Sequence, residues 1–285
     1  MWPFTRTPTV PVLRFTGTIG MATPLRPGIS LAAYAGAIEK AFEASKLPSV
    51  AILINSPGGS PVQSNLIFKR IRQLADEKKK RVYVFCEDVA ASGGYFLAIA
   101  GDEIYADPSS IVGSIGVISS GFGFVDAIDK LGIERRVYTA GLNKSTLDPF
   151  LPEKAEDVAR LKALQLDVHD VFIGLVKERR LGKLKAPDAE LFSGAFWAGA
   201  KAADFGLIDG ISDVRTKMRE LHGDKVKLRV FEPEKPGLLG RMRKLSSTAG
   251  GAWPSIVSTD SVGLAFASDL VSAIEARALW SRFGL

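Results

Sequence analysis

Two short apolar runs, each followed by a glycine turn and then by a helical pattern, constrain this sequence most. The apolar runs lie at residues 50–54 and 82–86, the glycine turns at 58–59 and 93–94, and the helical patterns at 61–78 and 95–100. A continuous apolar run is typical of a strand that is covered on both faces, as in a parallel sheet. Parallel strands that alternate with helices are joined by right-handed crossovers. The pattern therefore predicts an α/β fold with a largely parallel sheet.

Further elements extend this pattern on both sides. Residues 30–45 place apolar side chains at three- and four-residue spacing, which predicts an amphipathic helix with Ser30 as its N-cap. Residues 153–182 carry the longest such pattern, with one apolar stripe. We also expect strands at 10–19, 103–106, 111–118, 135–139 and 225–231, and shorter helices at 125–131 and within 192–210.

Composition and charge exclude several classes of protein. The net charge of +6 is spread over short basic clusters without interleaved aromatic residues, so nucleic-acid binding is not expected. One cysteine and two histidines exclude an internal disulfide framework and a zinc site of the Cys/His type. Cys86 lies in an apolar run and is expected to be inert packing. Residues 108–125 are uncharged, but their five serines and four glycines favour turns and a short strand over a membrane span.

Ser92 is the candidate nucleophile. It lies between the apolar run at 82–86 and the helical pattern at 95–100. A strand-turn-helix junction exposes such a side chain and directs the N–H groups of the helix toward a developing negative charge. Gly58 and Gly59 follow a neighbouring strand, so their N–H groups can converge on the same point at the sheet edge. Two alternatives are that Ser92 is only an N-cap and that the glycines hold a phosphate, although no Gly-Lys-Ser/Thr sequence supports the latter.

A serine nucleophile needs a base. His169 and His222 both fall in helical patterns and not in turns, so each is expected to be a packed or solvated histidine and not a triad member. Lysine can serve as a base when desolvation lowers its pKa. Lys144 lies in a loop after an expected strand, among small polar residues and without an acidic residue within three positions. The residues alone leave open whether Lys144 is a base or an exposed loop lysine.

Five motifs follow one another in a characteristic order. They are Asn55-Ser-Pro-Gly-Gly59, Ala90-Ala-Ser-Gly-Gly-Tyr95, Gly113-Ser-Ile-Gly-Val117, Lys144-Ser145 followed by Asp148-Pro149-Phe150, and residues 192–209. In order and spacing they resemble the signal peptide peptidase A-type serine peptidases, the SppA/SohB/protease IV group. The resemblance covers roughly residues 10–230 as one peptidase domain. It implies a Clp protease/crotonase-like fold of repeated β-β-α/β-α-β units with a largely parallel sheet.

The resemblance also implies a role for each candidate residue. Ser92 would be the nucleophile, Lys144 the general base and Ser114 a hydroxyl beside the lysine. The N–H of Gly58 or of Gly59, together with that of Gly93, would form the oxyanion hole. The expected activity is that of a serine endopeptidase, independent of ATP, cofactors and metals, that hydrolyses extended peptides such as cleaved signal peptides.

An assembly is implied as well. Small members of the family form homo-oligomeric rings or domes in which serine and lysine meet across a subunit interface, so we expect Ser92 to pair with Lys144 of a neighbouring subunit. The expected partners are therefore peptides and further copies of the chain. Two other functions stay open: a crotonase-fold enzyme acting on acyl-CoA thioesters, and a non-catalytic scaffold that binds peptides in its cleft.

Both ends of the sequence depart from the family pattern. Family members usually carry an N-terminal membrane anchor, whereas residues 1–12 contain prolines at positions 3, 8 and 11. We expect a disordered start at 1–9 and a protein that is either membrane-associated without a transmembrane span or cytoplasmic. Residues 231–285 match nothing in the family. Their basic, amphipathic pattern predicts an appendage that is dispensable for folding and influences access to the cleft or contact with a membrane surface.

Overall fold

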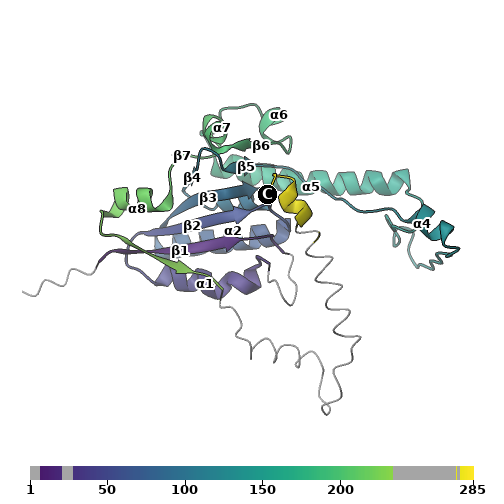
Figure 1. The fold of residues 1–285 in the computed structure, drawn as a ribbon, viewed down its shortest axis with the longest axis horizontal. Coiled ribbons are helices and arrows are strands. Elements are labelled where there is room, and N and C mark those ends of the chain that lie inside the picture. The colour runs from purple at the N-terminus through teal and green to yellow at the C-terminus, as the bar shows by residue number, and fades with distance from the viewer. Residues whose placement is uncertain (1–6, 21–27, 234–273, 275–276) are drawn as a thin grey trace, which may run out of the picture.

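One eight-stranded sheet lies at the centre of the molecule (Figure 1). The computed structural model describes residues 7–20, 28–233, 274 and 277–285, and the statements below refer to these residues. The strands are β1 (Thr9–Thr16), β2 (Ser49–Ser56), β3 (Arg81–Ala91), β4 (Glu103–Ala106), β5 (Ile111–Gly113), β6 (Phe196–Ala198), β7 (Gly210–Ile211) and β8 (Lys227–Phe231). The helices are α1 (Leu31–Glu43), α2 (Pro61–Lys78), α3 (Gly93–Ala98), α4 (Val125–Lys130), α5 (Ala155–Arg179), α6 (Asp188–Leu191), α7 (Gly199–Asp204) and α8 (Val214–His222).

The sheet follows the order β6-β5-β3-β2-β1-β8, with β4 paired to β3 and β7 paired to β4. Every pairing is parallel except that of β5 with β6, which confirms the predicted largely parallel α/β fold. β3 is longer than expected, and its first residues pair with β4 while its last three pair with β5. The ends of β3 and β5 therefore lie side by side.

The core occupies both faces of the sheet. Alternate residues along each strand point to opposite faces, so Leu13 and Val84 belong to one cluster with α1, α2, α3 and α5. Val12 and Tyr83 belong to a second cluster with Met218 of α8. Burial on both faces is the reason that the strand runs are continuously apolar. The side chain of Ser30 accepts a hydrogen bond from the Ala33 N–H and caps α1, as predicted.

Residues 119–154, which we call the arm, extend away from the sheet with the first half of α5 (Figure 1). No residue of the arm is buried. Phe124 stacks on Phe150 with 5.4 Å between ring centroids, and Arg135 pairs with Asp148, which closes the arm onto itself. Large apolar side chains nevertheless point into solvent on the arm: Phe122, Leu131, Ile133, Tyr138 and Leu142. An exposed apolar surface of this kind marks an interaction site.

Three predicted elements differ from the structure. Residues 135–139 form no strand, because they lie on the arm, where no neighbouring strand offers a hydrogen-bonding partner. The strand expected at 111–118 ends at Gly113, since Gly113 and Ser114 both take a positive φ that leaves the extended conformation. The helix expected within 192–210 is limited to α7, and its first residues instead form β6, which pairs with β5.

The apolar stripe of α5 is also only partly buried. Leu164 and Val171 are each 59% exposed, whereas Phe172 and Val176 are buried in the core. The prediction of a long helix is confirmed, but its N-terminal half carries apolar side chains that nothing in the described chain covers. An exposed apolar surface of this kind, next to the arm, marks an interaction site.

A buried arginine ties the end of α5 to the loop before β7. The guanidinium of Arg180 is 2% exposed, donates twice to the Gly206 carbonyl at 2.9 and 2.7 Å, and pairs with Asp209 at 2.7 Å. Burial alone would raise the pKa of Asp209, but hydrogen bonds from Arg180 and Lys183 lower it below its usual range. Arg180 therefore holds together parts of the chain that are distant in sequence.

Replacing Arg180 by alanine is expected to lower the free energy of unfolding by about 3–5 kcal/mol, because the Gly206 carbonyl loses both guanidinium donors and Asp209 loses its buried cation and keeps only Lys183 and the Ile104 N–H. Urea denaturation measures the change. Arg136→Ala removes an exposed pair with Glu134 and is the matched control, with an expected loss of less than about 1 kcal/mol. Equal small losses for both variants would contradict the role of Arg180.

Candidate active site

Ser92 occupies the turn between β3 and α3. Its φ of 52° and ψ of −121° are unusual for a non-glycine residue. The turn is held by the Ser92 N–H, which donates to the Gly113 carbonyl at 2.8 Å, and by the Ser92 carbonyl, which accepts from the Phe96 N–H at 3.0 Å. The Ser92 side chain makes no capping hydrogen bond. The predicted strand-turn-helix junction is therefore present, and the N-cap alternative does not account for the hydroxyl group.

The Gly58-Gly59 turn packs directly against Ser92. A Cβ atom on Gly58 would lie 2.8 Å from both the Ser92 Cβ and the Gly93 nitrogen, and one on Gly59 would lie 2.1 Å from the Ile19 carbonyl oxygen. Both glycines also have a positive φ. No side chain fits at either position, so glycine is required where the two turns meet.

Two backbone N–H groups at this point have no acceptor among the described residues. The Gly58 N–H already donates to the Ser56 hydroxyl at 3.2 Å. The Gly59 N–H donates to no backbone oxygen in the described chain. The Gly93 N–H begins α3, where helical N–H groups lack an acceptor within the helix. Of the three predicted donors, Gly59 and Gly93 are thus better placed than Gly58 to hold an oxyanion.

Ser114 also lies at this end of the sheet. It follows β5, is 4% exposed, and its N–H donates to the Ala195 carbonyl at 2.7 Å. Its neighbour Gly113 supplies the carbonyl that binds the Ser92 N–H. Within one chain, Ser114 is therefore close to Ser92 and not to the loop of Lys144.

Lys144 lies on the arm, far from Ser92 of the same chain. Its side chain is exposed, and its loop packs beside α4, beyond the N-terminus of α5 (Figure 1). Val168 and Phe172, farther along α5, lie near Ser92. The 13 helical steps from Ala155 to Val168 span about 20 Å at 1.5 Å per step. One chain therefore does not bring the serine and the lysine together.

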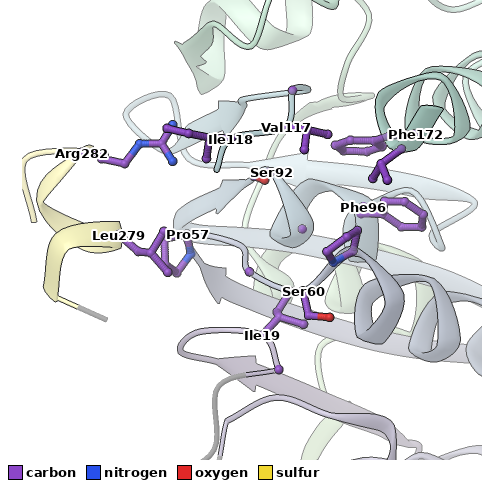
Figure 2. A pocket seen from close by; sticks show the side chains of 16 residues that line it. Ile19, Pro57, Ser60, Ser92, Phe96, Val117, Ile118, Phe172, Leu279 and Arg282 are labelled. Carbon is purple, nitrogen blue, oxygen red and sulfur yellow. The ribbon is translucent and has the colours of Figure 1, made fainter. Parts of the chain in front are cut away.

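A cavity of about 380 Å³ opens beside Ser92 (Figure 2). One side is apolar and contains Phe96, Val168 and Phe172, and the rings of Phe96 and Phe172 stack at 4.8 Å. Val117 and Ile118 continue this surface, and both side chains are exposed. The cavity can thus hold an apolar side chain of a ligand next to the Ser92 hydroxyl.

Three apolar residues near the candidate site residues in sequence do not line the cavity. Tyr95 and Ile115 are buried in the core, and the Tyr95 hydroxyl donates to the Leu207 carbonyl at 2.7 Å. Phe124 lies on the arm. Adjacent helical residues point in different directions, so Phe96 faces the cavity in place of Tyr95.

Both histidines are packed, as predicted. The Nε2 atom of His169 lies 2.9 Å from the Ile115 carbonyl oxygen and joins α5 to the segment after Ser114. His222 bonds to the Ser49 hydroxyl at 3.0 Å, and burial lowers its pKa. Cys86 is buried, and burial raises the pKa of its thiol to about 12, in agreement with inert packing. Among the described residues, no cluster of three or more potential ligands is arranged to bind a metal ion.

No helix in the described ranges combines the length and the apolar character that crossing a membrane requires.

A serine on a strained turn beside two free N–H groups is an arrangement that serine peptidases use. The sequence profile of Peptidase family S49 matches residues 74–228. This range is more than half of the chain and includes Ser92, Ser114 and Lys144. The chain therefore belongs to peptidase family S49, a family of serine peptidases, and the predicted family and fold class are confirmed.

Two relatives with protease names agree with this assignment, and a third relative has a different name. A protein of Synechocystis that carries the name of a protease is 30% identical, with 83% of this chain and 84% of that protein covered. The chloroplast serine protease SPPA of Arabidopsis thaliana is 30% identical over 61% of this chain and 25% of its own length. A Brucella abortus protein named Na⁺/H⁺ antiporter NhaA is 55% identical over 97% of this chain. The chain spans only 37% of that protein, whose name describes a much longer molecule.

Proposed function

We propose that this protein is a serine endopeptidase that uses a Ser-Lys dyad. The observation that carries the proposal is the uncapped Ser92 hydroxyl on a strained turn, beside a cavity and two free N–H groups. Strain at such a position is typical of functional residues. Ser92 is the nucleophile, Lys144 the base, and Gly59 and Gly93 the oxyanion donors, while Ser114 supports the lysine.

The reaction is an acyl transfer. Neutral Lys144 accepts the proton of the Ser92 hydroxyl while Oγ attacks the peptide carbonyl carbon. The negative charge that develops on the carbonyl oxygen is held by the Gly59 and Gly93 N–H groups. The C–N bond then breaks, the leaving amine takes the proton from Lys144, and an acyl ester remains on Ser92. Water, deprotonated by Lys144, hydrolyses the ester and restores the enzyme. None of these reaction steps uses a cofactor.

The lysine is supplied by a neighbouring subunit. Lys144 lies on the exposed arm beyond the N-terminus of α5, and the part of α5 between the arm and Val168 at the cavity is about 20 Å long. The arm and the first half of α5 carry apolar side chains, including Phe122, Leu142 and Leu164, that no described part of the same chain covers. A partner that covers them would also desolvate the lysine, which favours its neutral form. Repetition of one heterologous contact closes a ring or a dome.

The substrates are extended peptides with apolar side chains, such as the remnants of cleaved signal peptides. The apolar side of the cavity, formed by Phe96, Val168 and Phe172, accepts one such side chain beside Ser92. Val117 and Ile118 lie in an exposed segment next to the cavity, where a peptide backbone can pass.

Labelling with a fluorophosphonate probe tests the nucleophile. The intact assembly is expected to be phosphonylated on Ser92 Oγ with loss of fluoride, because only an activated serine reacts. Peptide mass mapping locates the label. Ser92→Ala should remove it, whereas Ser109→Ala, at an exposed loop serine, should leave it unchanged. Absence of label from Ser92 in the wild-type assembly would contradict the proposal and favour an acyl-CoA enzyme or a peptide-binding scaffold.

A further inference from the structure

The C-terminal residues 277–285 form part of the cavity wall beside Ser92. Residues 277–281 are helical and 282–284 form a turn. Phe283 is 7% exposed and packs against Val89 and Ala91, at the end of β3 just before Ser92. Its ring also lies 5.0 Å from that of Phe196 in β6, and Trp280 joins the same cluster. This anchoring fixes the segment next to the nucleophile.

Leu279, which precedes Trp280, and Arg282, which precedes Phe283, face the cavity. Leu279 and Arg282 are three positions apart, so they share one side of the helix and its final turn. Both line the cavity that contains Ser92. In Figure 2 they lie on one side of Ser92, while Phe96 and Phe172 lie on the other. The cavity therefore has an apolar side and a side that bears a guanidinium group.

Arg282 is the only charged residue among the described residues that line this cavity. No carboxylate of the described chain forms an ion pair with it, and its Cζ atom lies 5.9 Å from the centroid of the neighbouring Phe283 ring. A peptide that fills the cavity would displace water from the guanidinium. Loss of water without a new partner is costly for a charged group, and a carboxylate supplies the strongest replacement.

We propose that Arg282 is a specificity-determining residue that binds a carboxylate of the peptide substrate. The carboxylate is either an acidic side chain or the free C-terminus, and it lies across the scissile bond from the side chain held by Phe96 and Phe172. This assignment rests on the proposed peptidase function. It gives the C-terminal segment a direct part in the choice of substrate.

Two pairs of fluorogenic peptides test the assignment with the full-length assembly. The members of the first pair carry Glu or Gln at one position near the cleaved bond, and this pair is made in turn for each such position. The members of the second pair have the same sequence and differ only in a free or an amidated C-terminus. The wild-type protein is expected to cleave the carboxylate member about three- to tenfold faster in kcat/KM. A response of the first pair alone identifies an acidic side chain, and a response of the second alone identifies the C-terminus.

Variants of Arg282 assign the preference to this residue. Arg282→Ala should bring the ratio of kcat/KM for the carboxylate peptide to kcat/KM for its uncharged partner close to one. Arg282→Glu should make the uncharged peptide the better substrate. Arg282→Lys should retain part of the preference for the carboxylate peptide, because lysine lacks the two-pronged geometry of the guanidinium. Arg277→Ala is the matched control: Arg277 is an exposed arginine of the same segment that does not line the cavity, and its variant should keep the ratio.

The outcomes separate the two proposals. Equal cleavage within both pairs by the wild-type protein, or a preference that persists in Arg282→Ala, overturns the role of Arg282 and leaves the peptidase proposal intact. Failure to cleave any peptide, together with no fluorophosphonate label on Ser92, overturns both.

Discussion

Ser92→Ala is expected to lower kcat/KM on a fluorogenic peptide by about 10⁴-fold or more, because it removes the atom that forms the acyl-enzyme. Lys144→Ala should cause a loss of similar size, since residues that act as one catalytic unit lose most of their effect when either is removed. Both variants should keep the wild-type melting temperature. Ser92 is only partly buried and Lys144 is exposed, so neither substitution creates a cavity in the core.

Lys144→Arg distinguishes a base from a positive charge. Arginine keeps the charge but is not deprotonated in proteins, so this variant should be as inactive as Lys144→Ala. Lys130→Ala, at an exposed lysine of α4 on the same arm, is the control and should keep its activity. Wild-type rates for Lys144→Arg, or a loss of less than about tenfold for Lys144→Ala, would show that Lys144 is not the base.

The central sheet and the nucleophile turn could be predicted because their signals are local. β2 and α2 follow from a continuous apolar run, a glycine turn and a helical pattern that are adjacent in sequence. Parallel strands end at one edge of the sheet, so the same signals place Gly59 near Ser92. The structure adds that the Gly58 N–H donates a hydrogen bond to the Ser56 hydroxyl. This bond depends on the detailed path of the turn, which the sequence pattern does not give.

The errors arise where a residue depends on a distant partner. The pattern at 135–139 favours a strand, but no neighbouring strand lies on the arm. The stripe of α5 predicts a buried face, yet Leu164 and Val171 are exposed, since the local spacing of apolar residues does not show how much of the stripe reaches the core. Arg282 was missed for a related reason. Its position beside Ser92 depends on the packing of Phe283 against the end of β3, far away in sequence.

The central claim is that each active site is built from two subunits, and mixing two inactive variants tests it. Ser92→Ala and Lys144→Ala subunits are purified separately, dissociated, mixed in equal amounts and reassembled. Each interface takes its serine from one subunit and its lysine from the next, so random mixing should make about a quarter of the sites intact. The mixture should therefore recover about a quarter of the wild-type activity.

The control replaces the Lys144→Ala subunit by one that carries both substitutions. This mixture contains no intact Ser92 and should stay inactive, which excludes recovery by contaminating wild-type protein. Differently tagged subunits, isolated together on both tags, show that mixed assemblies have formed. Activity near a quarter of the wild-type level supports a dyad shared between subunits, whereas mixed assemblies that remain inactive would contradict it.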